Sequence, residues 1–126
     1  MWTIEYDYIA DWLGRLDKPT LECVVAAIEL LAEEGPTLGR PLVDTVKGSR
    51  HKNMKELRPT SPGMSEFRIL FAFDPKRHAI LLLGGDKSGT TTSKRPNKQK
   101  WSGWYRKAIP IADARFDEHL ERIKKG

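Results

Sequence analysis

The sequence is poor in cysteine and lacks long apolar runs, and both shortages narrow the classes of protein it can belong to. Its 126 residues include one cysteine, Cys23, which excludes a disulfide framework within the chain and a cysteine-based zinc cluster. No apolar run approaches the ~20 residues that a membrane-spanning helix needs, and the N-terminus carries acidic side chains where a signal peptide has basic ones. We therefore expect one soluble domain over residues 1–126, located in the cytoplasm.

Familiar catalytic and metal-binding motifs are also missing. His51, His78 and His119 share no ligand spacing with Cys23, so the spacing predicts no metal site. The segment Gly85-Asp86-Lys87-Ser88 resembles the end of a phosphate loop, but aspartate stands where glycine should precede the lysine. No serine–histidine–aspartate signature occurs in its usual context. These absences argue against a conventional hydrolase, and nothing in the sequence requires a cofactor.

Positive charge predominates and is unevenly distributed. The chain has 22 lysines and arginines against 17 aspartates and glutamates, a net charge of +5. Residues 1–35 carry 2 basic and 8 acidic side chains, whereas residues 36–126 carry 20 basic and 9 acidic ones. This asymmetry favours an anionic partner for the larger part of the chain. The alternative is a solvated surface whose two halves attract each other.

The acidic N-terminal part predicts a short strand and a helical hairpin. Residues 2–6 alternate between apolar and polar side chains, and apolar residues from Tyr8 to Leu16 recur at helical spacing. A second helix is predicted to begin at Asp17, with Pro19 just inside it, and to end at Gly35. Two helices with so short a junction should form a hairpin.

The middle of the chain predicts three strands joined by tight turns, which form an antiparallel meander. The strands are Met54–Arg58, Glu66–Phe73 and His78–Leu83, and the segment Pro36–Asn53 before them reads as a long surface loop. We expect the helical hairpin to cover the aromatic face of the meander, which makes the fold class α+β. The residues predicted on that face are Phe67, Ile69, Phe71 and Phe73.

The composition changes after Leu83. Residues 84–100 combine glycine, serine and threonine with lysine and arginine, so we expect this stretch to be mobile and cationic. From Trp101 to Ala108 aromatic and apolar residues repeat at helical spacing, and a last helix is predicted to begin near Pro110.

Strand parity predicts cationic side chains on the face opposite the aromatic one. If the aromatic residues face the helices, Arg68 points to the other, open face, which Arg58 shares. The end of the third strand brings Lys87 to the rim of the same face. Arginine forks hold phosphate oxygens and stabilise charge that gathers on them, so this face suits phosphodiester chemistry. The alternative is that Arg68 is solvated or pairs with Glu66 or Glu56.

The order of these features resembles that of the RelE/ParE superfamily of toxins, and the phage-derived, HigB-like branch matches best. The motifs that carry the resemblance are KELRP, SEFRILFAFDP and AILLLGGDKSG, which follow a short strand and a helical hairpin. Together they cover nearly the whole chain. The resemblance implies a RelE-like fold, with a small antiparallel sheet, an N-terminal helical hairpin and a C-terminal helix.

The resemblance also implies a toxin of a type II toxin–antitoxin system, neutralised by a cognate antitoxin protein. RelE- and HigB-type members are similar to metal-free ribonucleases that cleave mRNA on the ribosome and so inhibit translation, without a cofactor. The implied reaction is attack of a ribose 2′-OH on the adjacent phosphate. It needs a base, cations around the phosphate and an acid for the leaving oxygen.

Carried onto this sequence, the resemblance implies roles for four residues. Arg68 is the transition-state stabiliser of the central strand, and Arg58 and Lys87 are the basic residues that follow the neighbouring strands. Tyr105 is the C-terminal aromatic. The sequence departs from RelE at Met54 and Glu56, where RelE has lysines, and the general base is therefore open. The candidates are His51, Lys52, Lys55 and Asp86. The residues expected to bind RNA or the ribosome are Lys47, Arg50, Lys52, Lys94, Arg95, Lys98 and Lys100.

Two other functions stay open at this point. A ParE-like inhibitor of DNA gyrase would bind a protein, and such members lack the cationic cluster. A non-catalytic RNA-binding protein of the same fold would fit the missing strand lysines. For the leading hypothesis we expect an antitoxin, mRNA and the ribosome as partners, and neither a membrane nor a metal.

Overall fold

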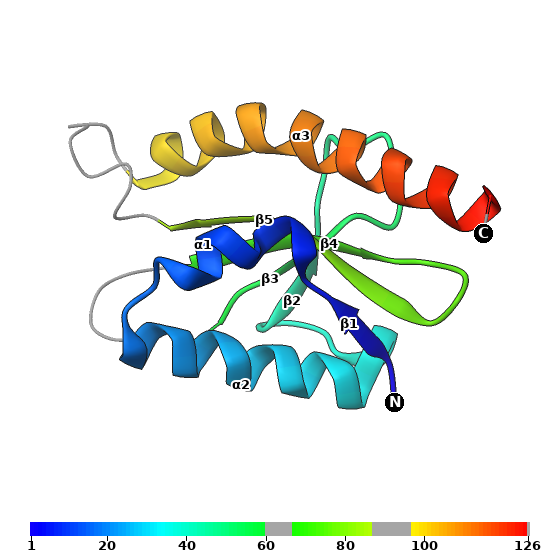
Figure 1. Ribbon diagram of the computed structural model, residues 1–126. Helices are drawn as coiled ribbons and strands as arrows, with labels where there is room; N and C mark the ends of the chain where they lie inside the picture. Colours follow the sequence, from blue (N-terminus) through cyan, green and yellow to red (C-terminus); the bar gives the residue numbers. More distant parts are fainter. Residues whose placement is uncertain (60–66, 87–96, 126) are drawn as a thin grey trace.

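The computed structural model describes residues 1–59, 67–86 and 97–125, which form a five-stranded mixed sheet with helices on both faces (Figure 1). The strands are β1 (Thr3–Glu5), β2 (Val43–Thr45), β3 (Lys55–Leu57), β4 (Phe67–Phe73) and β5 (His78–Asp86). The α-helices are α1 (Ala10–Gly14), α2 (Lys18–Glu34) and α3 (Asn97–Lys125), and η1 (Asp7–Ile9) and η2 (Gly35–Thr37) are 3-10 turns. The α+β class and the RelE-like arrangement are confirmed.

The sheet is larger than the predicted meander. Its strand order is β1-β5-β4-β3-β2, and β3, β4 and β5 pair antiparallel as predicted. β1 lies within the strand predicted over residues 2–6, but it pairs parallel with β5, so the sheet is mixed rather than antiparallel. The prediction of a loop is wrong at β2, which has three residues, too few for alternation to identify a strand.

Helix α2 begins where the sequence predicts. The Asp17 carboxylate accepts a hydrogen bond of 2.9 Å from the backbone N–H of Thr20, and Pro19 occupies the first turn. Apolar side chains of α2 pack on the face predicted to be aromatic. The buried residues of this layer include Val24, Ala27, Leu31, Leu57, Ile69, Phe71 and Leu81.

The opposite face of the sheet is not open, because α3 packs on it (Figure 1). Met54 of this face, which precedes β3, is completely buried. Leu70 and Ala72 of β4 also point to this side, so β4 is apolar on both faces and needs cover on both. The buried residues of this second layer include Met54, Leu70, Ala72, Ile80, Leu82, Ala108, Ile109, Ala112 and Phe116.

Helix α3 begins at Asn97, well before the predicted start near Pro110, and the proline lies inside it. Proline removes a helix hydrogen bond and usually ends a helix. Here Ala108, Ile109 and Ala112 are buried against the sheet on either side of Pro110, so tertiary packing carries the helix through it. None of the helices in the described ranges is both long and apolar enough to cross a lipid bilayer.

Two tryptophans pack against the end of β5, which continues past its predicted end at Leu83. A Cβ at Gly84 would lie 2.4 Å from Cε3 of Trp12, and a Cβ at Gly85 would lie 2.4 Å from Nε1 of Trp104. Successive strand residues face opposite sides, so α1 and α3 each lay an indole directly on the glycine backbone. This part of β5 has no room for a side chain on either face.

We expect Gly85→Ala to lower the free energy of unfolding by about 1–3 kcal/mol, because its Cβ would overlap the Trp104 ring. Gly14→Ala is the matched control: it ends α1 and has nothing within 4 Å of an added Cβ, so it should leave stability unchanged or raise it by up to ~1 kcal/mol. Urea unfolding followed by circular dichroism measures both. Equal stability of Gly85→Ala and the native chain would contradict the packing.

Candidate active site

Arg58 and Arg68 converge on the carboxylate of Glu56, which is 3% exposed. Arg58 follows β3 and Arg68 lies in the neighbouring β4. The Nε and Nη2 atoms of Arg58 donate to Glu56 Oε1 at 2.9 and 2.5 Å, and Nη1 of Arg68 lies 3.9 Å from Glu56 Oε2. A carboxylate this deeply buried is stable in its charged form only when it is paired. The two arginines supply that pairing.

Tyr105 connects this group to α3. Its hydroxyl donates a hydrogen bond to Oε2 of Glu56 and accepts one from Nη1 of Arg68. The Arg68 guanidinium also lies 5.5 Å from the centroid of the tyrosine ring, within the range of a cation–π interaction. The structure therefore brings three of the predicted site residues, Arg58, Arg68 and Tyr105, together around Glu56, which was not predicted as a site residue. We call Glu56, Arg58, Arg68 and Tyr105 the Arg68 cluster.

The environment of the cluster keeps its phenol neutral. Burial raises the pKa of Tyr105, the hydrogen bond and charge of Glu56 add to this, and Arg68 partly opposes it, so that the pKa is about 12. For Arg58, burial favours loss of the proton, but the hydrogen bond and charge of Glu56 outweigh it and the pKa is raised. At neutral pH the cluster thus offers a protonated tyrosine and a permanently charged Arg58.

The two arginines differ in exposure. The side chain of Arg68 is 16% exposed and that of Arg58 is 37% exposed. Arg58 also lies 3.7 Å from Oδ2 of Asp44 on β2. An anionic ligand from solvent would therefore contact Arg58 first, and would reach Arg68 only after it had lost part of its own hydration. The predicted open face is replaced by a half-buried group of charges under the first turns of α3.

His51 lies apart from the Arg68 cluster. Its Nε2 is 2.7 Å from Oδ1 of Asp117 on α3, and its ring packs edge-on against Phe116 at 4.9 Å between centroids. Asp117 and Tyr105 are twelve residues apart on α3, which is roughly 18 Å along an ideal helix. His51 would reach a phosphate held by Arg68 only after leaving α3.

Two aspartates of α3 anchor the segment that carries His51. Ser49 Oγ donates to Oδ1 of Asp113 at 2.5 Å, and the backbone N–H of Arg50 donates to Oδ2 at 3.2 Å. The Arg50 guanidinium pairs with Asp117, so this predicted RNA contact already has an acidic partner. Sequence reasoning missed both aspartates. The available signal was their i, i+4 spacing, which puts them on one helix face.

The other predicted basic residues are scattered. Lys55 has the strand parity of Leu57, so it lies on the α2 side of the sheet, where its Nζ donates to Thr45 Oγ1 at 3.1 Å. Lys47 and Lys52 are exposed between β2 and β3. Lys87, Lys94 and Arg95 lie outside the described residues, as do the side chains of Asp86, Lys98 and Lys100.

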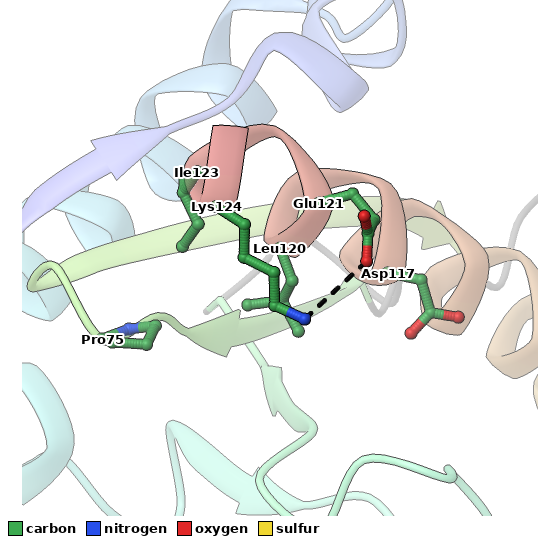
Figure 2. Close-up of a pocket in the computed structure, with 6 residues that line it drawn as sticks. All are labelled: Pro75, Asp117, Leu120, Glu121, Ile123 and Lys124. Atoms are coloured by element: carbon green, nitrogen blue, oxygen red, sulfur yellow. Dashed lines mark ion pairs between the residues drawn. The ribbon is translucent and has the colours of Figure 1, made fainter. Parts of the chain in front are cut away.

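A surface hollow lies elsewhere, between the β4–β5 turn and the C-terminal end of α3 (Figure 2). Its volume is about 350 Å³, and Lys124 beside it lies 3.9 Å from Glu121. The lining residues are Pro75, Asp117, Leu120, Glu121, Ile123 and Lys124. Apolar side chains and two carboxylates do not suit a phosphate, so we do not place the phosphodiester site here.

Possible metal ligands also lie away from the Arg68 cluster. Within the described ranges, Glu5, Asp74 and His78 bring their ligand atoms within 4.8 Å of one another. His78 begins β5, whereas Gly85, the partner of Arg68, lies seven residues further along the same strand. That separation is roughly 23 Å in an extended strand. The two groups of side chains are therefore independent sites.

Comparisons with known proteins give consistent matches. Residues 11–117 match the model of a family described as phage derived protein Gp49-like. The chain is 55% identical over 123 residues to a protein of Mycobacterium tuberculosis named "Putative toxin HigB2", covering 98% of this chain and 56% of that protein. It is 50% identical over 109 residues to "Putative toxin HigB3" of the same organism, covering 86% of this chain and 84% of that protein. The chain thus spans little more than half the length of the first relative.

The raised pKa of Tyr105 predicts a late step in a spectrophotometric titration of the tyrosines. We expect one of the three phenols to ionise near pH 12, and Tyr105→Phe to remove that step. The pKa of Tyr105 in the folded chain exceeds the ordinary tyrosine value of 10.0, so the unfolded chain loses this proton at a lower pH. Protonated Tyr105 therefore contributes its full stabilisation of the folded chain below pH 10, and this contribution declines as the pH rises from 10 to 12. If the phenol that Tyr105→Phe removes from the titration curve ionises near pH 10, like an ordinary tyrosine, the result would contradict the geometry of the Arg68 cluster.

Proposed function

The chain belongs to the phage-derived Gp49-like family as a HigB-like member, and on that premise we propose that it is the toxin of a toxin–antitoxin pair. Two proteins named as HigB toxins support this, since each is at least half identical to the chain over most of its length. The partner that this function requires is a cognate antitoxin protein. Because the chain covers 56% of the first relative, the proposal concerns the domain that the two share.

We propose further that the toxin is an endoribonuclease that cleaves mRNA. The observation that supports this activity is the Arg68 cluster, in which two guanidinium groups and a protonated phenol surround one buried carboxylate. Guanidinium forks bind phosphate oxygens, and fixed cations stabilise the charge that develops on a phosphorane. Because Glu56 and α3 hold these groups in place, little reorganisation is needed when the phosphate arrives.

The proposed reaction is an internal transesterification of RNA. The ribose 2′-oxygen loses its proton to a base and bonds to the adjacent phosphorus, and the bond to the 5′-oxygen breaks. That oxygen takes up a proton, so the products are a 2′,3′-cyclic phosphate and a 5′-hydroxyl. Arg68 stabilises the phosphorane, and the more exposed Arg58 binds a phosphate oxygen from the solvent side. Tyr105 holds Arg68 in place, since its hydroxyl accepts from Arg68 and donates to Glu56. Glu56 positions all three.

The base must be a residue other than these four. Tyr105 keeps its proton up to about pH 12, and the oxygens of Glu56 already accept hydrogen bonds from Arg58 and Tyr105. We propose Asp86, which ends β5 one residue after Gly85, the partner of Arg68, and pairs with Phe67. Alternation along the strand gives it the parity of the face opposite Arg68, so in this proposal it reaches the ribose around the end of the strand. Lys87 follows directly in the sequence and is the proposed proton donor to the leaving oxygen.

We propose that the ribosome presents the mRNA. The support is electrostatic: residues 36–126 carry 20 basic against 9 acidic side chains, and Lys47 and Lys52 are exposed between β2 and β3. Such a surface is attracted to ribosomal RNA at low ionic strength and less so as salt rises. The other predicted contacts, Arg50, Lys94, Arg95, Lys98 and Lys100, belong to the same proposal.

Induced expression with mapping of mRNA 5′ ends tests the function. We expect the native chain to arrest growth and to produce new mRNA ends, and Arg68→Ala to lower cleavage about 10²–10³-fold, because it removes the enclosed cation of the site. Arg15→Ala, an exposed arginine of the acidic N-terminal part, should behave like the native chain. Thermal unfolding of each variant separates lost chemistry from lost fold, and co-expression of the antitoxin should restore growth.

Each other outcome of this experiment identifies a different function. Growth arrest with intact mRNA and damaged DNA would replace the ribonuclease by a gyrase inhibitor. Absence of arrest by a soluble, abundant native chain would show that the substitution of the RelE lysines by Met54 and Glu56 accompanies a loss of catalysis.

A second comparison tests the assignment of the base. We expect Asp86→Asn to lower cleavage at least tenfold, and His51→Gln to retain most of it, because Asp117 holds His51 roughly 18 Å along α3 from Tyr105. Cleavage of a ribosome-bound mRNA by purified variants at several pH values measures both. The opposite result, with His51→Gln inactive and Asp86→Asn active, would mean that the segment bearing His51 moves to the Arg68 cluster.

A further inference from the structure

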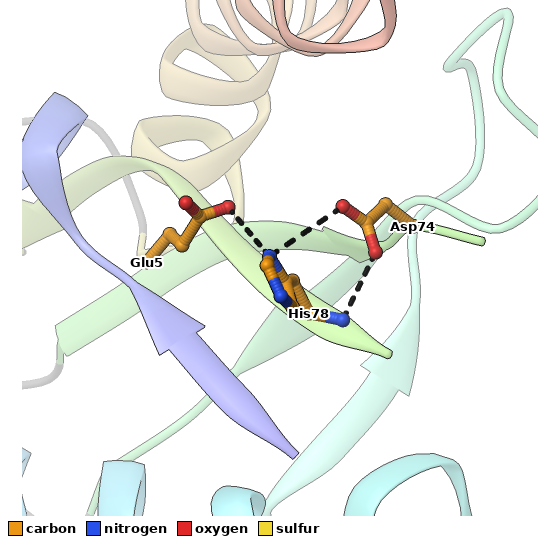
Figure 3. A group of neighbouring side chains, drawn as sticks. All are labelled: Glu5, Asp74 and His78. Carbon is orange, nitrogen blue, oxygen red and sulfur yellow. Dashed lines mark hydrogen bonds and ion pairs between the residues drawn. The ribbon is translucent and has the colours of Figure 1, made fainter. Parts of the chain in front are cut away.

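Four potential metal ligands meet at the end of the sheet opposite the Arg68 cluster. Glu5 ends β1, Asp74 and His78 flank the turn between β4 and β5, and His119 lies on α3. Figure 3 shows the first three pointing toward one another. Nδ1 of His78 is 3.2 Å from Oε2 of Glu5 and 3.9 Å from Oδ2 of Asp74. Nε2 of His119 is 2.7 Å from the same Asp74 oxygen and 3.9 Å from the same Glu5 oxygen.

We propose that Glu5, Asp74, His78 and His119 form a zinc-binding site. Zn²⁺ binds nitrogen and oxygen ligands at about 2.0–2.2 Å in a tetrahedron, which separates neighbouring ligand atoms by about 3.3–3.6 Å. Four of the six separations among these ligand atoms lie between 2.7 and 3.9 Å, on either side of this value. The ligand atoms of Glu5, Asp74 and His78 all lie within 4.8 Å of one another, so side-chain rotation is needed to bring the four donors around one ion.

Asp74 is already oriented as a metal ligand. Its Oδ1 accepts hydrogen bonds of 2.9 Å from the backbone N–H groups of Lys76 and His78, which leaves Oδ2 directed at the histidines. The side chain is fully buried. Such supporting bonds are typical of ligands that bind a metal tightly.

The donor set and the access also suit Zn²⁺. Two carboxylates balance the charge of the ion, and two imidazoles supply the nitrogen donors that it prefers over Mg²⁺ or Ca²⁺. Asp74 and His119 are enclosed, whereas the side chains of Glu5 and His78 are 41% and 33% exposed. A surface cavity of about 500 Å³ lined by Glu5 and His119 opens beside them, and gives an ion a path of entry. Lys76 and Arg122 also line it.

A bound ion would fasten three distant parts of the chain together. β1, the β4–β5 turn and the C-terminal half of α3 meet only through tertiary contacts, and the ion would replace the His119–Asp74 hydrogen bond by shared coordination. The proposed role is structural, and it is independent of the proposed ribonuclease activity because the Arg68 cluster lies at the other end of β5.

Titration of the tag-free, metal-stripped full chain with Zn²⁺ at pH 7.5, followed by calorimetry, tests the site. We expect one ion per chain, a higher melting temperature, and the intense visible absorption of tetrahedral Co²⁺ when cobalt replaces zinc. Glu5→Gln, His78→Gln and His119→Gln should each weaken Zn²⁺ binding at least tenfold. His51→Gln is the matched control, since His51 is also half-buried and paired to a carboxylate, at 2.7 Å, and it should bind Zn²⁺ like the native chain.

Two results would overturn the proposal. One is the absence of saturable Zn²⁺ binding by the native chain, which would leave the four residues as a network of ion pairs. The other is equal affinity in Glu5→Gln and His51→Gln, which would place the ion elsewhere. Because Glu5 is partly exposed, Glu5→Gln keeps the test valid even if the buried His119→Gln variant unfolds.

Discussion

The central strand of this protein is apolar on both faces, and the rest of the structure depends on that constraint. Ile69 and Phe71 of β4 face α2, whereas Leu70 and Ala72 face α3. Exposure of either face would leave a wide apolar surface in water, so a helix on one face alone is not sufficient to bury the sheet. Because burial of apolar side chains between α3 and the sheet stabilises the helix, α3 continues through Pro110 without ending.

Since α3 crosses the sheet, it also contacts the three groups of charges described above. Near its beginning Tyr105 connects Arg68 to Glu56, further along Asp117 binds His51, and His119 then reaches Asp74. Three groups of charges are thus spaced along one helix and share its docking. In the proposed toxin, an antitoxin that displaced α3 would disturb all three, whereas one that only covered its surface would leave them intact.

Much of the candidate site was predictable because strand parity is a local property. Alternation along the strands put Arg58 and Arg68 on the face away from α2, and the resemblance to RelE-type toxins added Tyr105. A pairing of Arg68 with Glu56 was one alternative and is confirmed, but the central role of Glu56 was not predictable. It looked like the loss of a lysine, and its effect as an organiser emerges only once Tyr105 lies above it. The position of His51 was equally hidden, because it depends on an aspartate 66 residues away.

The sequence by itself determined what neighbouring residues decide among themselves: the Asp17 cap, the apolar stripe of α2, the antiparallel pairing of the central strands and their parity. Only the tertiary structure decided that helices cover both faces of the sheet and that β1 and β2 join it. It also decided that the side chains of Glu5, Asp74, His78 and His119 come together. The physical reason is the range of the interactions. Hydrogen bonds and periodicity within a helix or strand act over a few residues, whereas contacts between distant segments depend on how the whole core is packed.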